Sequence, residues 1–242
     1  MLIRLTNKCS MHCTHCLSDS HPKGEDMANM IWVKSMALSS VLEPVPFLFI
    51  SGGEPTAHPY FINFMSSLIK IQDPRNVIIL SNGLFLKNKP FSKILLDLGV
   101  NFQITNDKRF YPRIPPQIKH KNVIYIDKIS LVSPFGRAKN NPDVVIDQKA
   151  PNCFNLRSCM YSTGDIKQSI SSLRLRGYFC TPSINVDGNI VAGEAPECGI
   201  IGNVDSSLSD INENLKNLKC DKCKQSKNLT GVYLDLWNKI NK

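Results

Sequence analysis

Residues 9–16 read CSMHCTHC, and this stretch directly follows the apolar run of residues 1–5. Its CxxxCxxC spacing places the thiols of Cys9, Cys13 and Cys16 on the loop that leaves a predicted strand. A closed zinc site normally takes four protein ligands, whereas an iron–sulfur cubane held by three thiolates keeps one iron open to a further ligand. The spacing therefore predicts an iron–sulfur site with one open position, and a share in a zinc site is the alternative.

The composition is that of a globular protein, with 42% hydrophobic and 20% charged residues in a chain of 242. This length allows one sizeable core with a small appendage. No apolar run is long enough to cross a bilayer, and the early strand and cysteines leave no room for a signal peptide. We therefore expect a cytoplasmic protein without a membrane partner. Nine clustered cysteines in that setting predict metal binding rather than disulfides.

The formal charge of +9 permits anionic partners, including an acidic peptide, a phosphorylated substrate or nucleic acid. The sequence has no run of five or more basic residues, and its basic residues do not alternate with aromatic ones. We therefore interpret the charge as lysines scattered over the surface, and we do not expect nucleic acid as a partner.

Strands and helices alternate along the first half of the chain. Short apolar runs predict strands, and apolar residues at helical spacing predict helices between them. The strands are expected at 2–6, 47–50, 77–80, 100–105, 123–126 and 129–132, and the helices at 25–42, 61–69 and 91–98. Prolines in residues 106–121 predict an irregular connection or a short helix. This order predicts a parallel sheet with right-handed crossovers, in which the loops after the strands converge at one edge.

The second half of the chain does not continue this alternation of strands and helices. Residues 139–152 are polar and contain two prolines, which predicts a linker. Residues 183–191 surround an Asp-Gly-Asn turn and predict a β-hairpin, while 208–218 and 229–240 have the apolar spacing of helices. Four cysteines are placed around these elements as two single residues and a closing CxxC motif: Cys180, Cys198, Cys220 and Cys223.

Three motifs, in this order, resemble the radical S-adenosylmethionine (radical SAM) family. They are the CxxxCxxC loop after the first strand, Gly52-Gly-Glu-Pro55 after the second and Ser81-Asn-Gly83 after the third. The resemblance implies a partial (β/α)6 barrel, similar to a TIM barrel, over residues 1–138. It also implies a [4Fe-4S] cluster on the three cysteines, S-adenosylmethionine on the open iron, and an external one-electron reductant such as flavodoxin or ferredoxin. Together the cofactors yield a 5′-deoxyadenosyl radical that removes a hydrogen atom from a substrate.

The same resemblance implies a set of cofactor-binding residues. Two successive glycines let the backbone approach a ligand, and backbone groups with the Glu54 carboxylate can meet the ammonium group of S-adenosylmethionine. Asn82 offers an amide to its ribose or carboxylate, and His15 can lie against its adenine, where the family more often has Phe or Tyr. Arg137 can pair with its carboxylate or with the substrate. The complete set is His15, Gly52, Gly53, Glu54, Pro55, Ser81, Asn82 and Arg137.

The later cysteines resemble the twitch extension of that family, the shorter relative of the SPASM domain. This resemblance implies a second domain over residues 139–242, with a linker, a hairpin, a closing helix and one auxiliary [4Fe-4S] cluster. The cluster would take up the electron left on an oxidised substrate radical. A structural zinc knuckle is the alternative. The implied ligands are Cys180, Cys198, Cys220 and Cys223. For the remaining Cys153 and Cys159 the alternatives are a further cluster with outside ligands, a redox pair or buried thiols, and buried thiols are the default.

Two classes of function follow from these patterns. The first is an enzyme that performs a radical oxidation or rearrangement on a peptide or a small molecule, with dehydrogenation of an amino-sugar or cyclitol alcohol as the small-molecule case. The second is a zinc-binding interaction or nucleic-acid protein, which CxxC motifs and positive charge permit but the alternating strands and helices do not favour. The substrate contacts expected from position alone are Asn106, Asp107, Arg109 and Tyr111.

Overall fold

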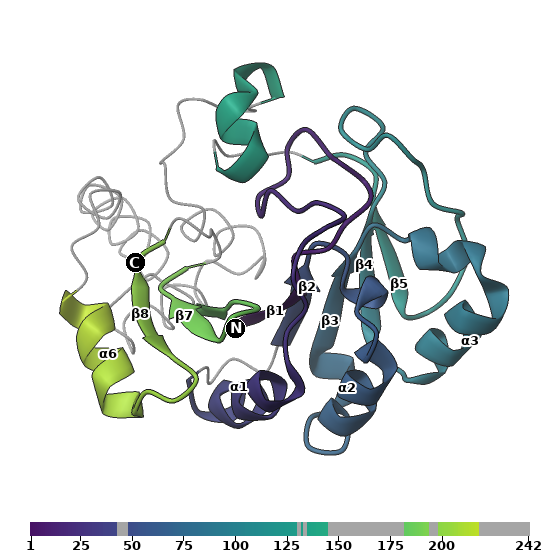
Figure 1. Ribbon diagram of the computed structural model, residues 1–242. Coiled ribbons are helices and arrows are strands. Elements are labelled where there is room, and N and C mark those ends of the chain that lie inside the picture. Colours follow the sequence, from purple (N-terminus) through teal and green to yellow (C-terminus); the bar gives the residue numbers. More distant parts are fainter. Residues whose placement is uncertain (43–47, 130–131, 133–134, 145–181, 194–197, 218–242) are drawn as a thin grey trace, which may run out of the picture.

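The computed structural model describes residues 1–42, 48–129, 132, 135–144, 182–193 and 198–217. The strands in this part of the chain form one sheet of eight strands in the order β5-β4-β3-β2-β1-β6-β7-β8 (Figure 1). The mixed α/β class predicted from the sequence is confirmed. Strand β1, which leads into the cysteine loop, lies inside the sheet with four strands on one side and three on the other.

The first five strands are parallel, and each pairs with the next one along the chain. These strands are β1 (Leu2–Thr6), β2 (Leu48–Gly52), β3 (Val77–Ser81), β4 (Asn101–Thr105) and β5 (Val123–Ile126). Their crossovers contain the helices α1 (Asn29–Leu42), α2 (Phe61–Leu68) and α3 (Lys89–Asp97). Short 3-10 turns are η1 (Pro55–Ala57), η2 (Pro74–Asn76), η3 (Leu84–Lys87), η4 (Gly136–Asn140) and η5 (Pro142–Val144). The connection 106–121 contains neither helix nor strand, so of the two predicted alternatives it is the irregular connection and not the short helix.

The later strands extend the same sheet on the other side of β1. Strand β6 (Ser183–Ile184) pairs in parallel with β1, and β7 (Asn189–Val191) and β8 (Ile200–Asn203) follow in antiparallel order. Strands β6 and β7 are the predicted hairpin. Strand β8 was not predicted, because its run is short and contains a glycine. The helix α6 (Leu208–Asn217) agrees with the helix expected at 208–218.

One predicted helix begins later than expected, and one expected strand is only partly covered by the described residues. Helix α1 begins at Asn29 rather than at residue 25, because the preceding backbone pairs with β1 and its loop. Met27 N donates to Leu5 O (2.8 Å) and Asn7 N donates to Glu25 O (2.8 Å). In the strand expected at 129–132, Ile129 is in no strand and Val132 forms an isolated bridge. The rest of that strand, most of the expected linker and the expected helix 229–240 lie outside the described residues.

The hydrophobic core lies between the parallel strands and their helices. Ile3 and Leu5 of β1 are fully buried, and Trp32 of α1 stacks on Phe64 of α2 with ring centroids 4.8 Å apart. Each such side chain contributes roughly 1.5–3 kcal/mol to folding through apolar burial. Arg4 and Thr6 alternate with these residues, so the other face of β1, which begins with Leu2, carries polar side chains toward its end. None of the described helices combines the length and apolar character needed to cross a membrane.

Candidate functional site

The cysteine loop is held at its base by backbone hydrogen bonds. Cys9 N donates to His21 O (3.1 Å), and His21 N donates to Asn7 O (3.2 Å). Between the first two cysteines, His12 has a φ of +51°, a left-handed conformation that is uncommon for a residue with a side chain and that turns the chain sharply. Cys16 N then donates to Cys13 O (3.2 Å) and closes a second turn. These turns direct all three thiols toward one cavity.

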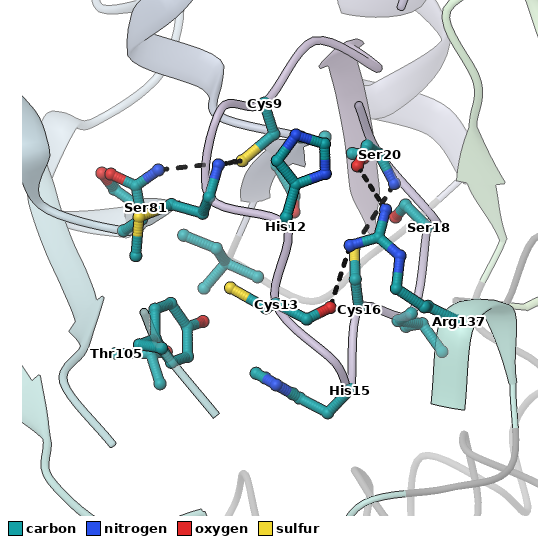
Figure 2. Close-up of a pocket in the computed structure, with 18 of the residues that line it drawn as sticks. Cys9, His12, Cys13, His15, Cys16, Ser18, Ser20, Ser81, Thr105 and Arg137 are labelled. Atoms are coloured by element: carbon teal, nitrogen blue, oxygen red, sulfur yellow. Dashed lines mark hydrogen bonds between the residues drawn. The ribbon is translucent and has the colours of Figure 1, made fainter. Parts of the chain in front are cut away.

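This cavity of about 280 Å³ opens where strands β1 to β4 end, and Figure 2 shows the residues around it. The prediction that the loops after the strands converge at one edge is confirmed. Glu54 and Pro55 do not line the cavity but are buried beside it. The predicted metal- and cofactor-binding residues that do line it are Cys9, Cys13, His15, Cys16, Gly52, Gly53, Ser81, Asn82 and Arg137.

The cysteine sulfurs accept hydrogen bonds from the surrounding loops. Cys9 Sγ accepts from Met11 N (3.4 Å) and from Asn82 Nδ2 (3.9 Å), and Cys16 Sγ accepts from Ser20 N (3.4 Å). Burial raises the pKa of Cys13 to about 12, and the neighbouring thiols of Cys9 and Cys16 add to this rise. Three thiolates cannot be held together here without a compensating positive charge, which bound iron would supply.

The arrangement of the three thiols is compatible with a cluster. Among the described residues, no three His, Cys, Asp or Glu side chains are grouped closely enough to hold a single metal ion. A cubane presents its irons at separate corners, so its thiolate ligands need not converge on one point. Three thiols that face one cavity, with N–H groups directed at two of the sulfurs, are therefore compatible with a cluster ligated by Cys9, Cys13 and Cys16.

Both glycines of the second motif are required by close packing against the cysteine loop. A Cβ on Gly52 would lie 2.2 Å from Thr6 O, and Gly52 also has a φ of +141°. A Cβ on Gly53 would lie 2.3 Å from Lys8 O and 3.0 Å from Cys9 Cβ. Gly53 N donates to Thr6 O (2.6 Å), which fixes this approach. The glycines thus place β2 directly against the residues that carry the first thiol.

We expect Gly53→Ala to weaken iron binding and to destabilise the apoprotein by about 1–3 kcal/mol, because the new methyl group must push Lys8 and Cys9 away. Urea unfolding of the apoprotein and iron content after anaerobic reconstitution measure the two effects. Thr14→Ala, at an exposed position of the same loop, is the matched control and should change neither. A Gly53→Ala protein with wild-type stability and iron content would contradict this packing argument.

Glu54 connects the three loops from beneath the cavity. Its side chain is buried, and Oε1 accepts from Ser81 Oγ (2.9 Å) and Thr56 Oγ1 (2.6 Å), while Oε2 accepts from Asn82 N (2.7 Å). Glu54 N in turn donates to Lys8 O (2.8 Å). Burial raises the pKa of this carboxyl group although the hydrogen bonds oppose the rise. The described partners of Glu54 are thus protein groups that position Asn82.

Arg137 clasps the cysteine loop from the other side. Its Nη1 donates to Cys13 O (2.9 Å) and its Nη2 donates to Ser20 O (2.7 Å) (Figure 2). Its Nε donates to Asp19 Oδ1 (2.8 Å). Its own N–H donates to Cys16 O (2.8 Å). The preceding Gly136 permits this approach, because it has a φ of +53° and a Cβ there would lie 2.2 Å from Leu17 O. The guanidinium group therefore supports the loop that carries the thiols while it also lines the cavity.

His15 lines the cavity as a neutral aromatic ring. Its centroid lies 4.8 Å from that of Phe110 and 5.2 Å from that of Tyr111. Burial lowers its pKa to about 4. Its Nδ1 is buried and has no hydrogen-bond partner among the described residues. A buried polar atom without a protein partner at a cavity wall is the kind of group that a bound ligand satisfies.

Of the four residues expected from their position to contact a substrate, one lines the cavity and three do not. Tyr111 lines the cavity, and burial raises the pKa of its hydroxyl group. Asp107 instead accepts from Arg109 Nη2 (2.6 Å) and from Ile129 N (2.7 Å), and these hydrogen bonds lower the pKa of Asp107. They also stabilise the loop that carries Phe110 and Tyr111. Asn106 donates to Asp127 Oδ1 (3.1 Å). Only Tyr111 of the four is a cavity residue.

Sequence reasoning missed other cavity residues, among them Arg4 and Thr105. Arg4 is buried, and its Nη1 donates to Ser183 Oγ (2.9 Å) and Asn185 Oδ1 (2.8 Å). A lone arginine within an apolar strand was the available signal, because a buried charge needs specific partners. For Thr105, its place at the end of β4 was the signal.

Of the second set of cysteines, the described residues include Cys198 alone. It lies just before β8, is partly buried and packs against the main hydrophobic core. The other three predicted ligands, Cys180, Cys220 and Cys223, lie outside the described residues, as do Cys153 and Cys159. The auxiliary cluster stays a prediction.

No protein-family model and no curated protein matches the chain. Among solved structures, it is similar to BtrN in complex with AdoMet and 2-DOIA, with a TM-score of 0.55 and 17% identity over 94% of this chain and 85% of BtrN. An open conformation of BtrN gives a TM-score of 0.48 at 18% identity over 94% and 84% of the two chains. Streptococcus suis SuiB bound to S-adenosylmethionine gives 0.43 at 12% identity over 87% and 64%. The chain therefore shares the overall fold of BtrN.

Proposed function

We propose that this chain is a radical S-adenosylmethionine enzyme. The observation that carries the proposal is that three cysteine thiols, two glycines and the Asn82 amide line one cavity where parallel strands end. The fold it shares with BtrN, a protein solved in complex with AdoMet, supports the same proposal. In this interpretation, Cys9, Cys13 and Cys16 hold a [4Fe-4S] cluster whose open iron takes S-adenosylmethionine.

When bound and reduced, these cofactors supply a 5′-deoxyadenosyl radical that abstracts a hydrogen atom from the substrate. The chain's own residues prepare the site for this chemistry. N–H groups of Met11 and Ser20 and the Asn82 amide donate to the cysteine sulfurs, and such hydrogen bonds raise the reduction potential of a cluster. The neutral ring of His15 offers an aromatic surface, and its buried Nδ1 can meet a ligand polar group.

The proposed reaction is a net oxidation or rearrangement of a peptide or a small molecule. The second candidate is dehydrogenation of an amino-sugar or cyclitol alcohol, and the fold shared with BtrN, solved with 2-DOIA as well as AdoMet, favours a small molecule. In either case Thr105 and Tyr111 are available on the cavity wall to contact it. We also propose that Cys180, Cys198, Cys220 and Cys223 bind an auxiliary [4Fe-4S] cluster that accepts the electron left on the substrate.

Anaerobic reconstitution with iron and sulfide tests this function. We expect a brown protein that forms 5′-deoxyadenosine from S-adenosylmethionine under reducing conditions, with iron in excess of one cubane per chain if the auxiliary cluster exists. Deuterated candidate substrates should transfer deuterium into 5′-deoxyadenosine, which identifies the substrate class. A colourless protein with stoichiometric zinc and no 5′-deoxyadenosine would refute the proposal and favour a zinc-binding interaction protein.

A further inference from the structure

A second cavity lies on the outside of the sheet, beside α3. It measures about 620 Å³ and has an apolar floor with a charged rim. The connection 106–121 contains no helix, so the flank of α3 is not covered by a helix between β4 and β5, where each preceding crossover has one. We call this cavity the α3 groove. Its floor consists of Leu86, Ser92, Leu96, Pro116 and Ile118, and its rim of Lys87, Lys89, Lys93, Asp97 and His120.

The α3 groove has an excess of basic side chains. Its lining includes three lysines, Lys87, Lys89 and Lys93, against the one carboxylate of Asp97. Asp97 pairs with Lys93 (2.9 Å), and Lys87 and Lys89 form no ion pair with any described residue. Basic side chains around an apolar floor complement a protein surface with acidic residues around an apolar centre, and such complementarity steers association.

The α3 groove is linked to the cysteine loop by a short chain of contacts. Asn82 Nδ2 donates to Cys9 Sγ (3.9 Å), and Leu84 N donates to Asn82 Oδ1 (2.9 Å). Leu86, two residues further along the turn η3, is on the groove floor, and its N–H donates to Gly83 O (3.1 Å). One turn of backbone therefore joins the groove to a residue that touches a predicted cluster ligand.

We propose that the α3 groove docks an acidic one-electron carrier protein of the flavodoxin or ferredoxin kind. This inference rests on the proposed function, which consumes one electron for each S-adenosylmethionine cleaved. The reduced carrier loses one electron, and that electron passes to the cluster held by Cys9 and its two partners through η3 and Asn82. The lysines orient the carrier, and the apolar floor retains it after the charges have brought it close.

The experiment compares Lys87→Glu/Lys89→Glu with the control Lys23→Glu/Lys70→Glu, which makes the same charge change at exposed lysines outside the groove. Calorimetric titration with oxidised flavodoxin at low salt measures docking directly. We expect the groove variant to weaken binding about tenfold or more, and the control to retain affinity within about threefold. With flavodoxin hydroquinone as reductant, the apparent KM for flavodoxin in 5′-deoxyadenosine formation should rise by the same factor. With dithionite the rate should not change.

Three outcomes would overturn the docking proposal. They are wild-type flavodoxin affinity in the groove variant, an equal loss in both variants, and an equal loss of the dithionite-driven rate. Loss of affinity for a glutamate-rich peptide with flavodoxin binding intact would assign the α3 groove to an acidic peptide instead. Failure of the wild-type protein to form 5′-deoxyadenosine with dithionite would refute the proposed function separately, and the titration would still test the groove.

Discussion

Replacing Cys9, Cys13 and Cys16 together with alanine should lower the rate of 5′-deoxyadenosine formation to less than about one hundredth of the wild-type rate. This corresponds to an activation free energy that is higher by more than about 2.7 kcal/mol. The expectation follows from the site, because these three thiols line one cavity. The rate is measured by chromatography of 5′-deoxyadenosine after anaerobic reconstitution with dithionite as reductant, together with the visible absorbance of bound iron.

The comparison variant is Cys198→Ala, which removes a proposed ligand of the auxiliary cluster. Cys198 lies before β8 and does not line the cavity, so its loss should lower the bound iron but leave S-adenosylmethionine cleavage intact. Continued 5′-deoxyadenosine formation by the triple variant would show that the three cysteines do not hold the reactive cluster. Loss of activity in Cys198→Ala to the same extent would indicate general instability rather than a local effect.

Glu54→Ala should have the second largest effect, on stability and on cofactor binding together. The substitution leaves three buried donors without their acceptor: Ser81 Oγ, Thr56 Oγ1 and Asn82 N. It also removes the cost of burying the carboxylate, so we expect the free energy of unfolding to fall by about 2–4 kcal/mol in total. Because Asn82 then loses its anchor, we also expect a lower affinity for S-adenosylmethionine. Urea unfolding of the apoprotein and equilibrium binding to the reconstituted protein measure the two effects.

Glu54→Gln separates shape from hydrogen bonding. The glutamine amide keeps the side-chain volume and one acceptor oxygen, so the free energy of unfolding of this variant should lie between those of the wild type and Glu54→Ala. Glu25→Ala is the control, since the Glu25 side chain is exposed and only its backbone oxygen holds the loop. If Glu54→Ala unfolds at the wild-type urea concentration, Glu54 is not the connection that its contacts indicate.

Local patterns predicted the parallel half of the fold because they arise from neighbouring residues. The apolar runs of β2 and β3 and the spacing of Phe61, Phe64 and Leu68 are enough to assign a strand–helix–strand unit, and parallel strands then bring their loops to one edge. For this reason the sequence alone is enough to expect the cysteines, the glycines and Asn82 around one cavity.

The tertiary roles of individual polar residues could not be predicted in the same way. Arg137 donates to backbone oxygens of Cys13 and Ser20, and any residue type presents such an oxygen, so the sequence has no signal for the pairing. Glu54 was assigned to a ligand because of its motif, and that assignment stays a prediction; its contacts with Ser81, Thr56 and Asn82 could not be predicted from the motif. The two-residue strand β6 was recognisable only as part of a hairpin, and its partner β1 lies at the other end of the chain.

The interior position of β1 has a consequence for how the chain is synthesised. Its pairing with β2 can form early, whereas its pairing with β6 needs Ser183 and Ile184. Until then a nascent chain presents one side of β1 as an open edge, and such edges template association with other chains. Contacts between residues as far apart in the sequence as β1 and β6 also slow folding. The entropy cost of closing the long loop must be met before strand pairing stabilises the chain. We therefore expect fragments that end before β6 to aggregate, and the full chain to gain yield from slow, cool expression.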